Sequence, residues 1–321
     1  MAIPTVYRSD DASAPVITGT AGDLVNALDA ILVNGYGAKA DAGWTIAYTG
    51  TNKRAYQQGS GLSHLLRVDD ADARLARVVG YGTMSDVDTG TNPFPTGAQI
   101  SGGLYMRKSI SADSTARPWI CFATDTTFYL FIYGNRTGAI LAAQHDGGDA
   151  NLGFGTLINT RVSGDINASF ICASSDTSAT STTASDTRQC LVSLGAAAQS
   201  TLYLNGSYNQ ASSESTQCYK RSSNLLISTL AQSGATGGPT FPEVTRGAMM
   251  LYPFVALQTL IPRGELPGLM SLGHPTTLAS ATGVPGHLLV VNGKGTYSGR
   301  DFYRVNTGLV WGVAIETSGN W

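Results

Sequence analysis

The chain has 321 residues and a formal net charge of −2 at pH 7, and charged residues make up only 13% of it, about half the roughly 25% of an average soluble domain. This balance excludes a basic footprint for nucleic acid and a polybasic segment for a membrane surface. No run of about eighteen apolar residues occurs, so no membrane-spanning helix is expected.

The first predicted element is an amphipathic helix over residues 21–34. Its apolar residues recur at three- and four-residue spacing, which places them on one face. Thr20 is expected to cap the helix, and Gly35 to end it, because glycine adopts positive φ without strain. We expect the apolar face to pack against a sheet. It consists of Leu24, Val25, Leu28, Ile31 and Leu32.

Beyond the helix, short runs of β-forming residues alternate with polar turns, which predicts strand after strand. Segments 86–95 and 262–268 each contain two prolines and are predicted to be a loop and a rigid turn. The expected strands are 44–48, 53–57, 62–68, 74–82, 104–108, 119–123, 128–133, 139–144, 169–173, 190–194, 202–204, 225–230, 249–257, 288–292, 301–305 and 309–317.

The densest apolar and aromatic stretch is 117–133. It contains two short runs, 119–123 and 128–133, around the polar break Thr124-Asp125-Thr126-Thr127, which has the length of a hairpin turn. Both runs are nearly continuous in apolar residues instead of alternating. We therefore expect this hairpin to lie near the middle of the fold, in a sheet that is covered on both faces.

The predicted fold class is α+β and mainly β, with antiparallel sheets arranged like a sandwich and one N-terminal amphipathic helix. Residues 174–187 are almost entirely Ser, Thr, Ala and Asp and have little to bury. Residues 174–188 are therefore expected to be a flexible loop or linker. It would divide a β-rich N-terminal domain, 1–173 with helix 21–34, from a β-rich C-terminal domain, 189–321.

Two acidic clusters invite a metal-site interpretation. Asp86, Asp88 and Asn92 have a spacing that suits calcium, but the position where an EF-hand carries its bidentate Glu holds Gly97. A capped turn explains this segment better. Asp69, Asp70 and Asp72 form the second cluster, for which we expect a solvated hairpin turn.

The histidines and cysteines show no catalytic or metal-binding pattern. His64, His274 and His287 are isolated, the His145–Asp149 segment is expected to be a plain loop, and neither HExxH nor a G-x-S-x-G elbow is present. A carboxylate pair of the glycosidase type stays open, because its members need not be close in sequence. Residues 1–8 lack the features of a signal peptide, so reduced, buried thiols are expected. The cysteines are Cys121, Cys172, Cys190 and Cys218.

Several tyrosines lie in Gly- or Ser-rich settings. Tyrosine on loops is favoured at contact surfaces, and it is equally common as a half-buried strand residue, so both interpretations stay open. These residues are Tyr36, Tyr81, Tyr203, Tyr208 and Tyr297.

Six stretches stand out as strings: AIPTVYRSDDASAP at 2–15, LVNGYGAK at 32–39, GWT at 43–45, YGTMSDVDTG at 81–90, RPW at 117–119 and RGELPGL at 263–269. Together they resemble a family of virion structural proteins of tailed bacteriophages. The resemblance runs through most of the first 135 residues and returns after residue 250, whereas 150–245 matches only loosely. The family has no catalytic signature to carry over, so the resemblance implies a place in the phage particle and no particular chemistry.

The expected function is that of a structural component of a tailed-phage virion, in the tail or baseplate, acting through subunit assembly. The composition agrees, because 38 glycines and few charges suit a surface packed against neighbours. The expected partners are other virion proteins and copies of the chain itself, and neither nucleic acid nor membrane. We expect no enzyme activity and no catalytic, cofactor-binding or metal-binding residue. The alternatives are a capsid decoration or cement protein, a host-receptor module that binds surface glycan, and a virion hydrolase.

Overall fold

The computed structural model describes residues 2–134, 150–173, 200–207, 214–220, 251–258, 261–272, 290–292, 299–305 and 313–321. Strands account for 49% and helices for 6% of the structure. The fold is therefore mainly β, with antiparallel sheets and one short helical segment near the N-terminus, which confirms the predicted class.

Within the described residues, twelve strands form one antiparallel sheet in the order β1-β8-β9-β10-β11-β12-β13-β14-β15-β18-β17-β16. Neighbours in this order are mostly neighbours in sequence, as in a meander, and β1 joins β8 across more than a hundred residues. The strands are β1 (Thr5–Arg8), β8 (Trp119–Ala123), β9 (Phe128–Ile132), β10 (Ala150–Thr156), β11 (Ser169–Ala173), β12 (Ser200–Leu204), β13 (Glu214–Lys220), β14 (Leu251–Gln258), β15 (Ile261–Leu272), β16 (Val290–Asn292), β17 (Asp301–Val305) and β18 (Val313–Glu316).

The second sheet of the described chain has six strands. They follow the order β2-β3-β4-β5-β6, and β7 pairs with the first half of the long strand β5. All pairings are antiparallel. The strands are β2 (Thr45–Gly50), β3 (Lys53–Gln57), β4 (Leu65–Asp69), β5 (Leu75–Asp86), β6 (Thr89–Phe94) and β7 (Leu104–Arg107).

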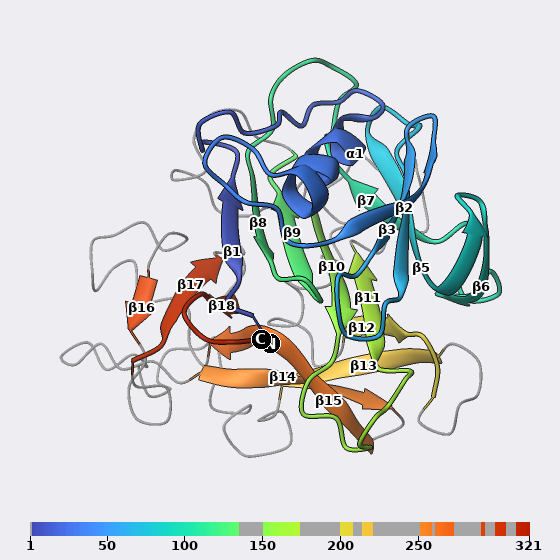
Figure 1. Ribbon diagram of the computed structural model, residues 1–321, viewed down its shortest axis with the longest axis vertical. Helices are drawn as coiled ribbons and strands as arrows, with labels where there is room; N and C mark the ends of the chain where they lie inside the picture. The colour runs from blue at the N-terminus through green and yellow to red at the C-terminus, as the bar shows by residue number, and fades with distance from the viewer. Residues whose placement is uncertain are drawn as a thin grey trace, which may run out of the picture.

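Strands β8–β11 form the middle layer of the molecule. One apolar cluster joins their first face to the second sheet and to the N-terminal helical segment. The other cluster joins their opposite face to β14, β15, β17 and β18, which belong to the same sheet. In Figure 1, the helix lies at the top and β2–β7 at the upper right, β8–β11 run through the centre, and β14 and β15 cross the lower part. The large sheet therefore curls back over its own middle strands.

The β8–β9 hairpin is covered on both faces, as its apolar sequence predicts. Every residue of both strands is buried. Trp119 and Cys121 point into the first cluster, and Ile120 and Phe122 into the second. Because successive side chains of a strand alternate between faces, only two apolar layers can bury such a run completely. Each large side chain buried in this way contributes roughly 1.5–3 kcal/mol.

The N-terminal helix begins with α1 (Asp23–Leu28) and continues as the π-helix η1 (Asp29–Asn34). Its apolar face is buried and Gly35 ends it with a φ of 70°, both as predicted. The predicted cap is wrong. The N-cap is Gly22 with a φ of 89°, and no side chain at that position caps the helix. The carboxylate of Asp70, distant in sequence, accepts the hydrogen bonds of the first turn instead.

The segments predicted to be a loop and a rigid turn are strands. Segment 86–95 holds the end of β5 and the whole of β6, and segment 262–268 lies inside β15. Proline is tolerated in strands at edges and irregular positions. β6 is an edge strand, and β15 pairs with β14 through two register irregularities. β10 also falls within 145–168, where no strand was predicted. The predicted strands 139–144, 190–194 and 225–230 lie outside the described residues.

The predicted linker, 174–188, lies outside the described residues. The strands nearest to it on either side, β11 and β12, pair directly through Phe170 with Leu204 and Ile171 with Tyr203. Strands of both expected domains thus share one sheet and one apolar cluster. The division into two domains stays a prediction. Neither helical segment in the described part of the chain has the length and apolar character of a membrane span.

Candidate functional site

A histidine between the two sheets contacts two polar side chains, one in the large sheet and one directly after its strand β12. His64 directly precedes β4, and its Nδ1 lies 2.7 Å from Oγ of Ser169, the first residue of β11. Its Nε2 lies 3.4 Å from the side-chain nitrogen Nδ2 of Asn205. The ring also packs edge-on against Phe94, with 6.3 Å between the ring centroids. No sequence pattern indicates this His64 cluster, because Ser169 and Asn205 are 105 and 141 residues away from His64 in sequence.

A serine so close to a histidine raises the question of nucleophilic catalysis. In that chemistry the histidine takes the serine proton while Oγ attacks a substrate. Ser169 is 0% exposed, so its Oγ offers no surface to a substrate. Burial also lowers the pKa of His64 to about 4, whereas an effective general base has a pKa near the working pH. The cluster is better suited to joining the two sheets.

Asp70 and Lys108 form an ion pair in which both side chains are 0% exposed. The Oδ2 atom of Asp70 accepts hydrogen bonds from the N–H groups of Leu24, at 2.8 Å, and Val25, at 3.4 Å. Lys108 Nζ contacts Asp70 Oδ1 and also donates to the carbonyl oxygen of Thr20. Burial raises the pKa of Asp70 to about 6, although Lys108 and the two N–H groups act in the opposite direction. The pair fastens the start of α1 to the second sheet.

The prediction of a solvated turn for the second acidic cluster is therefore wrong for Asp70. Its neighbours behave differently: Asp69 accepts a hydrogen bond from the side chain of Arg67, and Asp72 is exposed. The chain turns at this point, and Asp70 alone points inward. The sequence gives one usable signal, since Lys108 directly follows β7, whose residues are all buried. A lysine in such a place needs an anionic partner.

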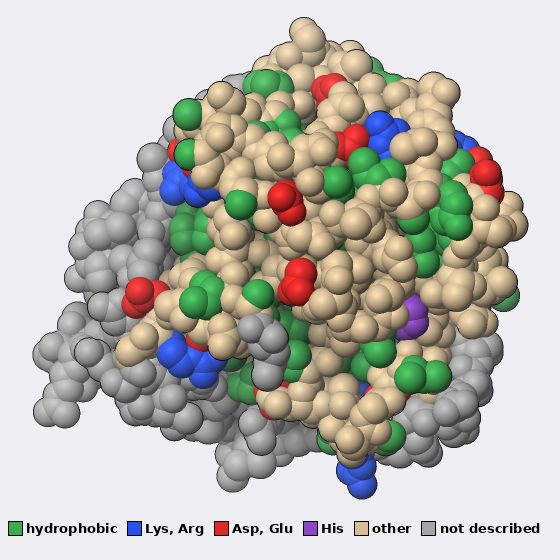
Figure 2. Space-filling model, viewed as in Figure 1, with side chains coloured by type: hydrophobic (Ala, Val, Ile, Leu, Met, Phe, Trp, Pro, Cys, Tyr) green, Lys and Arg blue, Asp and Glu red, His purple; other side chains and the backbone are tan. Residues whose placement is uncertain are grey.

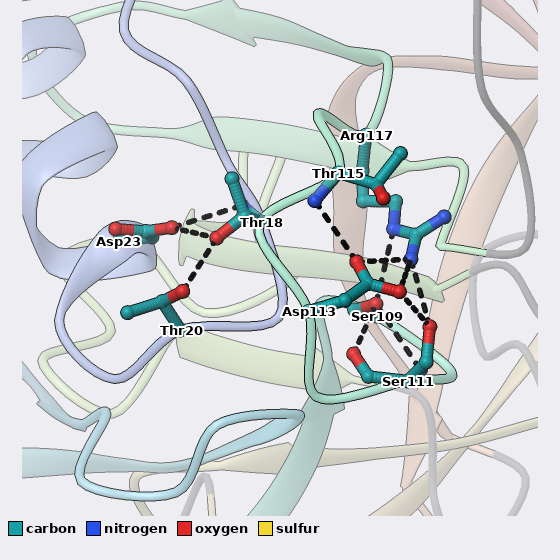
Figure 3. A network of polar contacts seen from close by, with 8 residues as sticks. All are labelled: Thr18, Thr20, Asp23, Ser109, Ser111, Asp113, Thr115 and Arg117. Atoms are coloured by element: carbon teal, nitrogen blue, oxygen red, sulfur yellow. Dashed lines mark hydrogen bonds and ion pairs between the residues drawn. The ribbon is translucent and has the colours of Figure 1, made fainter.

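Arg117 organises a third polar network (Figure 3). Its Nη2 donates to both carboxylate oxygens of Asp113, at 2.9 and 3.0 Å, and its Nε donates to Oγ of Ser109 at 3.0 Å. Hydrogen bonds from Ser111 and from the Thr115 N–H lower the pKa of Asp113. In the neighbouring segment, Thr18 donates to Thr20 and, from its N–H, to Asp23. The network orders the loop that leads into β8.

Arg263 belongs to β15 and is 1% exposed. Its Nε and Nη2 donate to Oδ2 of Asp165 at 3.2 and 2.7 Å, and its Nη1 donates to the carbonyl oxygen of Gly206 at 3.0 Å and to Oε1 of Gln258. This Arg263 clamp joins β15 to the β10–β11 connection and to the end of β12. Arg263 is the first residue of the RGELPGL stretch, and it lies in segment 262–268, which was predicted to be a rigid turn.

The first acidic cluster, at the β5–β6 turn, is occupied by cationic side chains. Lys53 Nζ lies 3.0 Å from Asp88, and Arg67 forms a second ion pair with the same carboxylate. The Oδ1 atom of Asp86 accepts the N–H of Asp88 at 3.3 Å. Among the described residues no group of three or more His, Cys, Asp or Glu could hold a metal ion.

Three of the six distinctive sequence stretches meet along β1. The Trp119 Nε1 donates to the carbonyl oxygen of Pro15 at 3.1 Å, and its ring packs edge-on against Tyr36. Tyr36 OH accepts a hydrogen bond from the N–H of Arg8, and Lys39 Nζ donates to the carbonyl oxygen of Val6 at 2.9 Å. These contacts occupy backbone groups on the free edge of β1. Covering an edge strand in this way opposes uncontrolled strand addition.

The remaining candidates divide into described and undescribed residues. Cys121 and Cys172 are buried and form no disulfide bond within the described part of the chain, which confirms the prediction for these two thiols. Tyr36 and Tyr81 are half-buried and Tyr203 is buried, as strand or packing residues. The other named candidates lie outside the described residues, or in β13 with no side-chain detail. They are His145, Asp149, His274, His287, Tyr208, Tyr297, Cys190 and, in β13, Cys218.

Comparison with models of known protein families and with curated proteins finds no match to this chain. Three of the described polar clusters, around His64, Asp70 and Arg263, connect segments that are distant in sequence. The Arg117 network instead ties together one loop.

Proposed function

We propose that this protein is a structural component of a tailed-phage virion, in the tail or baseplate, and that it acts by assembling with copies of itself and with other virion proteins. The observation that carries the proposal is the character of the surface. Charged residues make up 13% of the chain. On the face drawn in Figure 2, acidic and basic side chains stand singly or in small groups among uncharged atoms.

A surface with few charges lowers the desolvation cost of a protein–protein contact, since fewer ions lose water when it forms. Four large apolar side chains of the described residues are also exposed: Ile3, Val16, Val162 and Ile166, at 40–58%. Symmetric assembly buries such groups repeatedly, once in each copy.

The described interior supports the same proposal. Two buried ion pairs hold strands, loops and the helix together: Asp70 with Lys108, and Arg263 with Asp165. His64 has a depressed pKa and contacts a buried serine. These groups favour a rigid building block. The sequence stretches that resemble tailed-phage virion proteins indicate the phage particle as the assembly to which such a building block would belong.

The experiment that tests the proposal is to locate the protein in particles. Phage particles from infected cells would be purified and separated into heads and tails, and each fraction would be analysed by mass spectrometry for peptides of this chain. We expect the peptides in the tail fraction, at several copies per particle. Peptides in the head fraction would move the protein to the capsid, and their absence from purified particles would overturn the proposal.

A second measurement addresses the enzyme class separately. Purified protein would be incubated with peptidoglycan and with host surface polysaccharide, and the soluble products quantified. We expect no release above that of heat-inactivated protein. Release that a single Asp or Glu substitution abolishes would establish a hydrolase.

A further inference from the structure

The Lys108–Asp70 pair places an amine and a carboxyl group in contact in a site without solvent access. Both side chains are 0% exposed. The backbone of each residue is fixed: Asp70 N–H donates to the Asn52 carbonyl at 2.8 Å and its own carbonyl accepts from Gly22 at 3.0 Å. Lys108 N–H donates to the Arg74 carbonyl at 2.9 Å. The two reactive groups therefore meet with little conformational freedom left to lose.

We propose that Lys108 and Asp70 become joined by an amide bond between Nζ and Cγ once the protein has folded. In the overall step, the ammonium and the carboxylate condense to an amide and one water molecule. The Nζ–Cγ bond forms, the Cγ–Oδ1 bond breaks, and Oδ1 leaves as water with two protons from the lysine. The amide retains the third proton, so atoms and charge balance, and no oxidant, metal or cofactor takes part.

The surroundings of the pair favour each part of this step. When Nζ adds to Cγ, negative charge develops on the second carboxyl oxygen. Asp70 Oδ2 already accepts the N–H groups of Leu24 and Val25, so two donors are in place for that charge. The Thr20 carbonyl oxygen accepts a hydrogen bond from Nζ and orients the amine. Well-oriented groups within one molecule reach effective concentrations of about 10⁵–10⁸ M, and the fixed backbones of Asp70 and Lys108 favour such an orientation.

Burial also acts on the starting state. An ion pair without water is held at a desolvation cost that its mutual attraction only partly offsets. The same burial raises the pKa of Asp70 to about 6, which favours the uncharged acid. The amide has no net charge, and it leaves Oδ2 as a carbonyl oxygen that still accepts the helix N–H groups. Condensation thus removes two buried charges and keeps the hydrogen bonds of the helix start.

The test is the intact mass of the purified, fully denatured protein. We expect a mass lower than that of the sequence by one water molecule. After trypsin digestion, a peptide that begins at Val68 and ends at Arg74 should be joined to one that begins at Lys108, with no cleavage after Lys108. Tandem mass spectrometry of that species would locate the bond.

The matched control is Lys108→Met, which keeps a long side chain and removes the amine. Its mass should equal that of its own sequence, with a free peptide 68–74 after digestion. A wild-type mass equal to the unmodified sequence, together with free peptides, would overturn the proposal and leave the contact as an ion pair only. A loss of water located at any other pair of residues would overturn it as well. The decisive measurement is on the wild-type chain, so the folding of the variant does not affect the result.

Discussion

Arg263 and Asp165 are 98 residues apart in sequence and meet as a buried ion pair, with side chains 1% and 3% exposed. Arg263 belongs to β15, and Asp165 to the connection between β10 and β11. The guanidinium also donates to Gly206 and Gln258, so each side of the arginine has a partner. The clamp therefore fixes an exposed loop to a strand of the large sheet.

Arg263→Leu should lower the free energy of unfolding by about 3–5 kcal/mol, because it leaves the Asp165 carboxylate buried without its cation. Urea unfolding followed by tryptophan fluorescence would measure it. The control is Arg161→Leu, in the same loop region but exposed, which should change stability by less than about 0.5 kcal/mol. Equal effects of the two substitutions would show that the clamp contributes no stability.

The helix and the clamp show where sequence reasoning succeeds and where it stops. The buried hairpin and the apolar helix face follow from patterns within a few neighbouring residues, and both are confirmed. The N-cap was missed because Asp70, which caps the helix, is 46 residues away from Leu24. In β15, Pro262 and Gly268 have the composition of a turn, yet pairing with β14 and β18 decides the conformation. Polar contacts between segments that are distant in sequence leave no local spacing pattern from which they could be predicted.

His64 should make the protein sensitive to acid. Burial lowers its pKa in the folded state to about 4, from the ordinary value of 6.5 for histidine. The unfolded chain therefore binds a proton more readily, and the stabilising contribution is present above pH 6.5 and is lost as pH falls towards 4. Between pH 7.5 and 4.5 the loss should reach about 2–3 kcal/mol.

The measurement compares urea unfolding of the wild type and of His64→Gln at these two pH values. The variant should be less stable at pH 7.5 and should lose about 2–3 kcal/mol less on acidification than the wild type does. All other titrating groups are common to both proteins and cancel in the difference. Identical losses in the two proteins would mean that His64 is not protonated on unfolding.

Gly268 should be intolerant of a side chain. Its φ is +62°, and an added Cβ would lie 2.1 Å from Nε1 of Trp321, which donates to the carbonyl oxygen of Glu316. Gly164 is the matched control, with a φ of +68° and open space around its Cβ position. Gly164→Ala should cost about 1–2 kcal/mol from backbone strain alone. Gly268→Ala should cost roughly 1–3 kcal/mol more through the clash, which thermal unfolding of both variants would measure.

Cys121 should be inert in the folded protein. It is 0% exposed in β8, and burial raises the pKa of its thiol, which disfavours the reactive thiolate. Native protein treated with iodoacetamide at pH 8 should carry no label on the peptide that contains Cys121, whereas denatured protein should be labelled fully. Mass spectrometry assigns the label to individual cysteines. Rapid native labelling of Cys121 would contradict the position of β8 between two apolar layers.

The Arg263 clamp has a consequence for the proposed assembly. The clamped loop carries Val162 and Ile166, which are 40% and 57% exposed and lie four positions apart in sequence. Holding Asp165 between them limits the conformational entropy that the loop would lose on binding, and low ordering cost favours affinity. We therefore expect this loop to take part in contacts between subunits.

The double variant Val162→Ser, Ile166→Ser should dissociate at a higher protein concentration than the wild type, as measured by sedimentation velocity. Its dissociation constant should rise by about tenfold or more, because two exposed apolar side chains are removed from the contact. Its unfolding free energy should change little, because Asp165 and Arg263 are untouched. Ser163→Ala, an exposed position in the same loop, is the control and should leave association unchanged. A double variant that associates like the wild type would exclude this loop from the subunit contact. Ile3 and Val16 would then be the exposed large apolar side chains left, among the described residues, to form it.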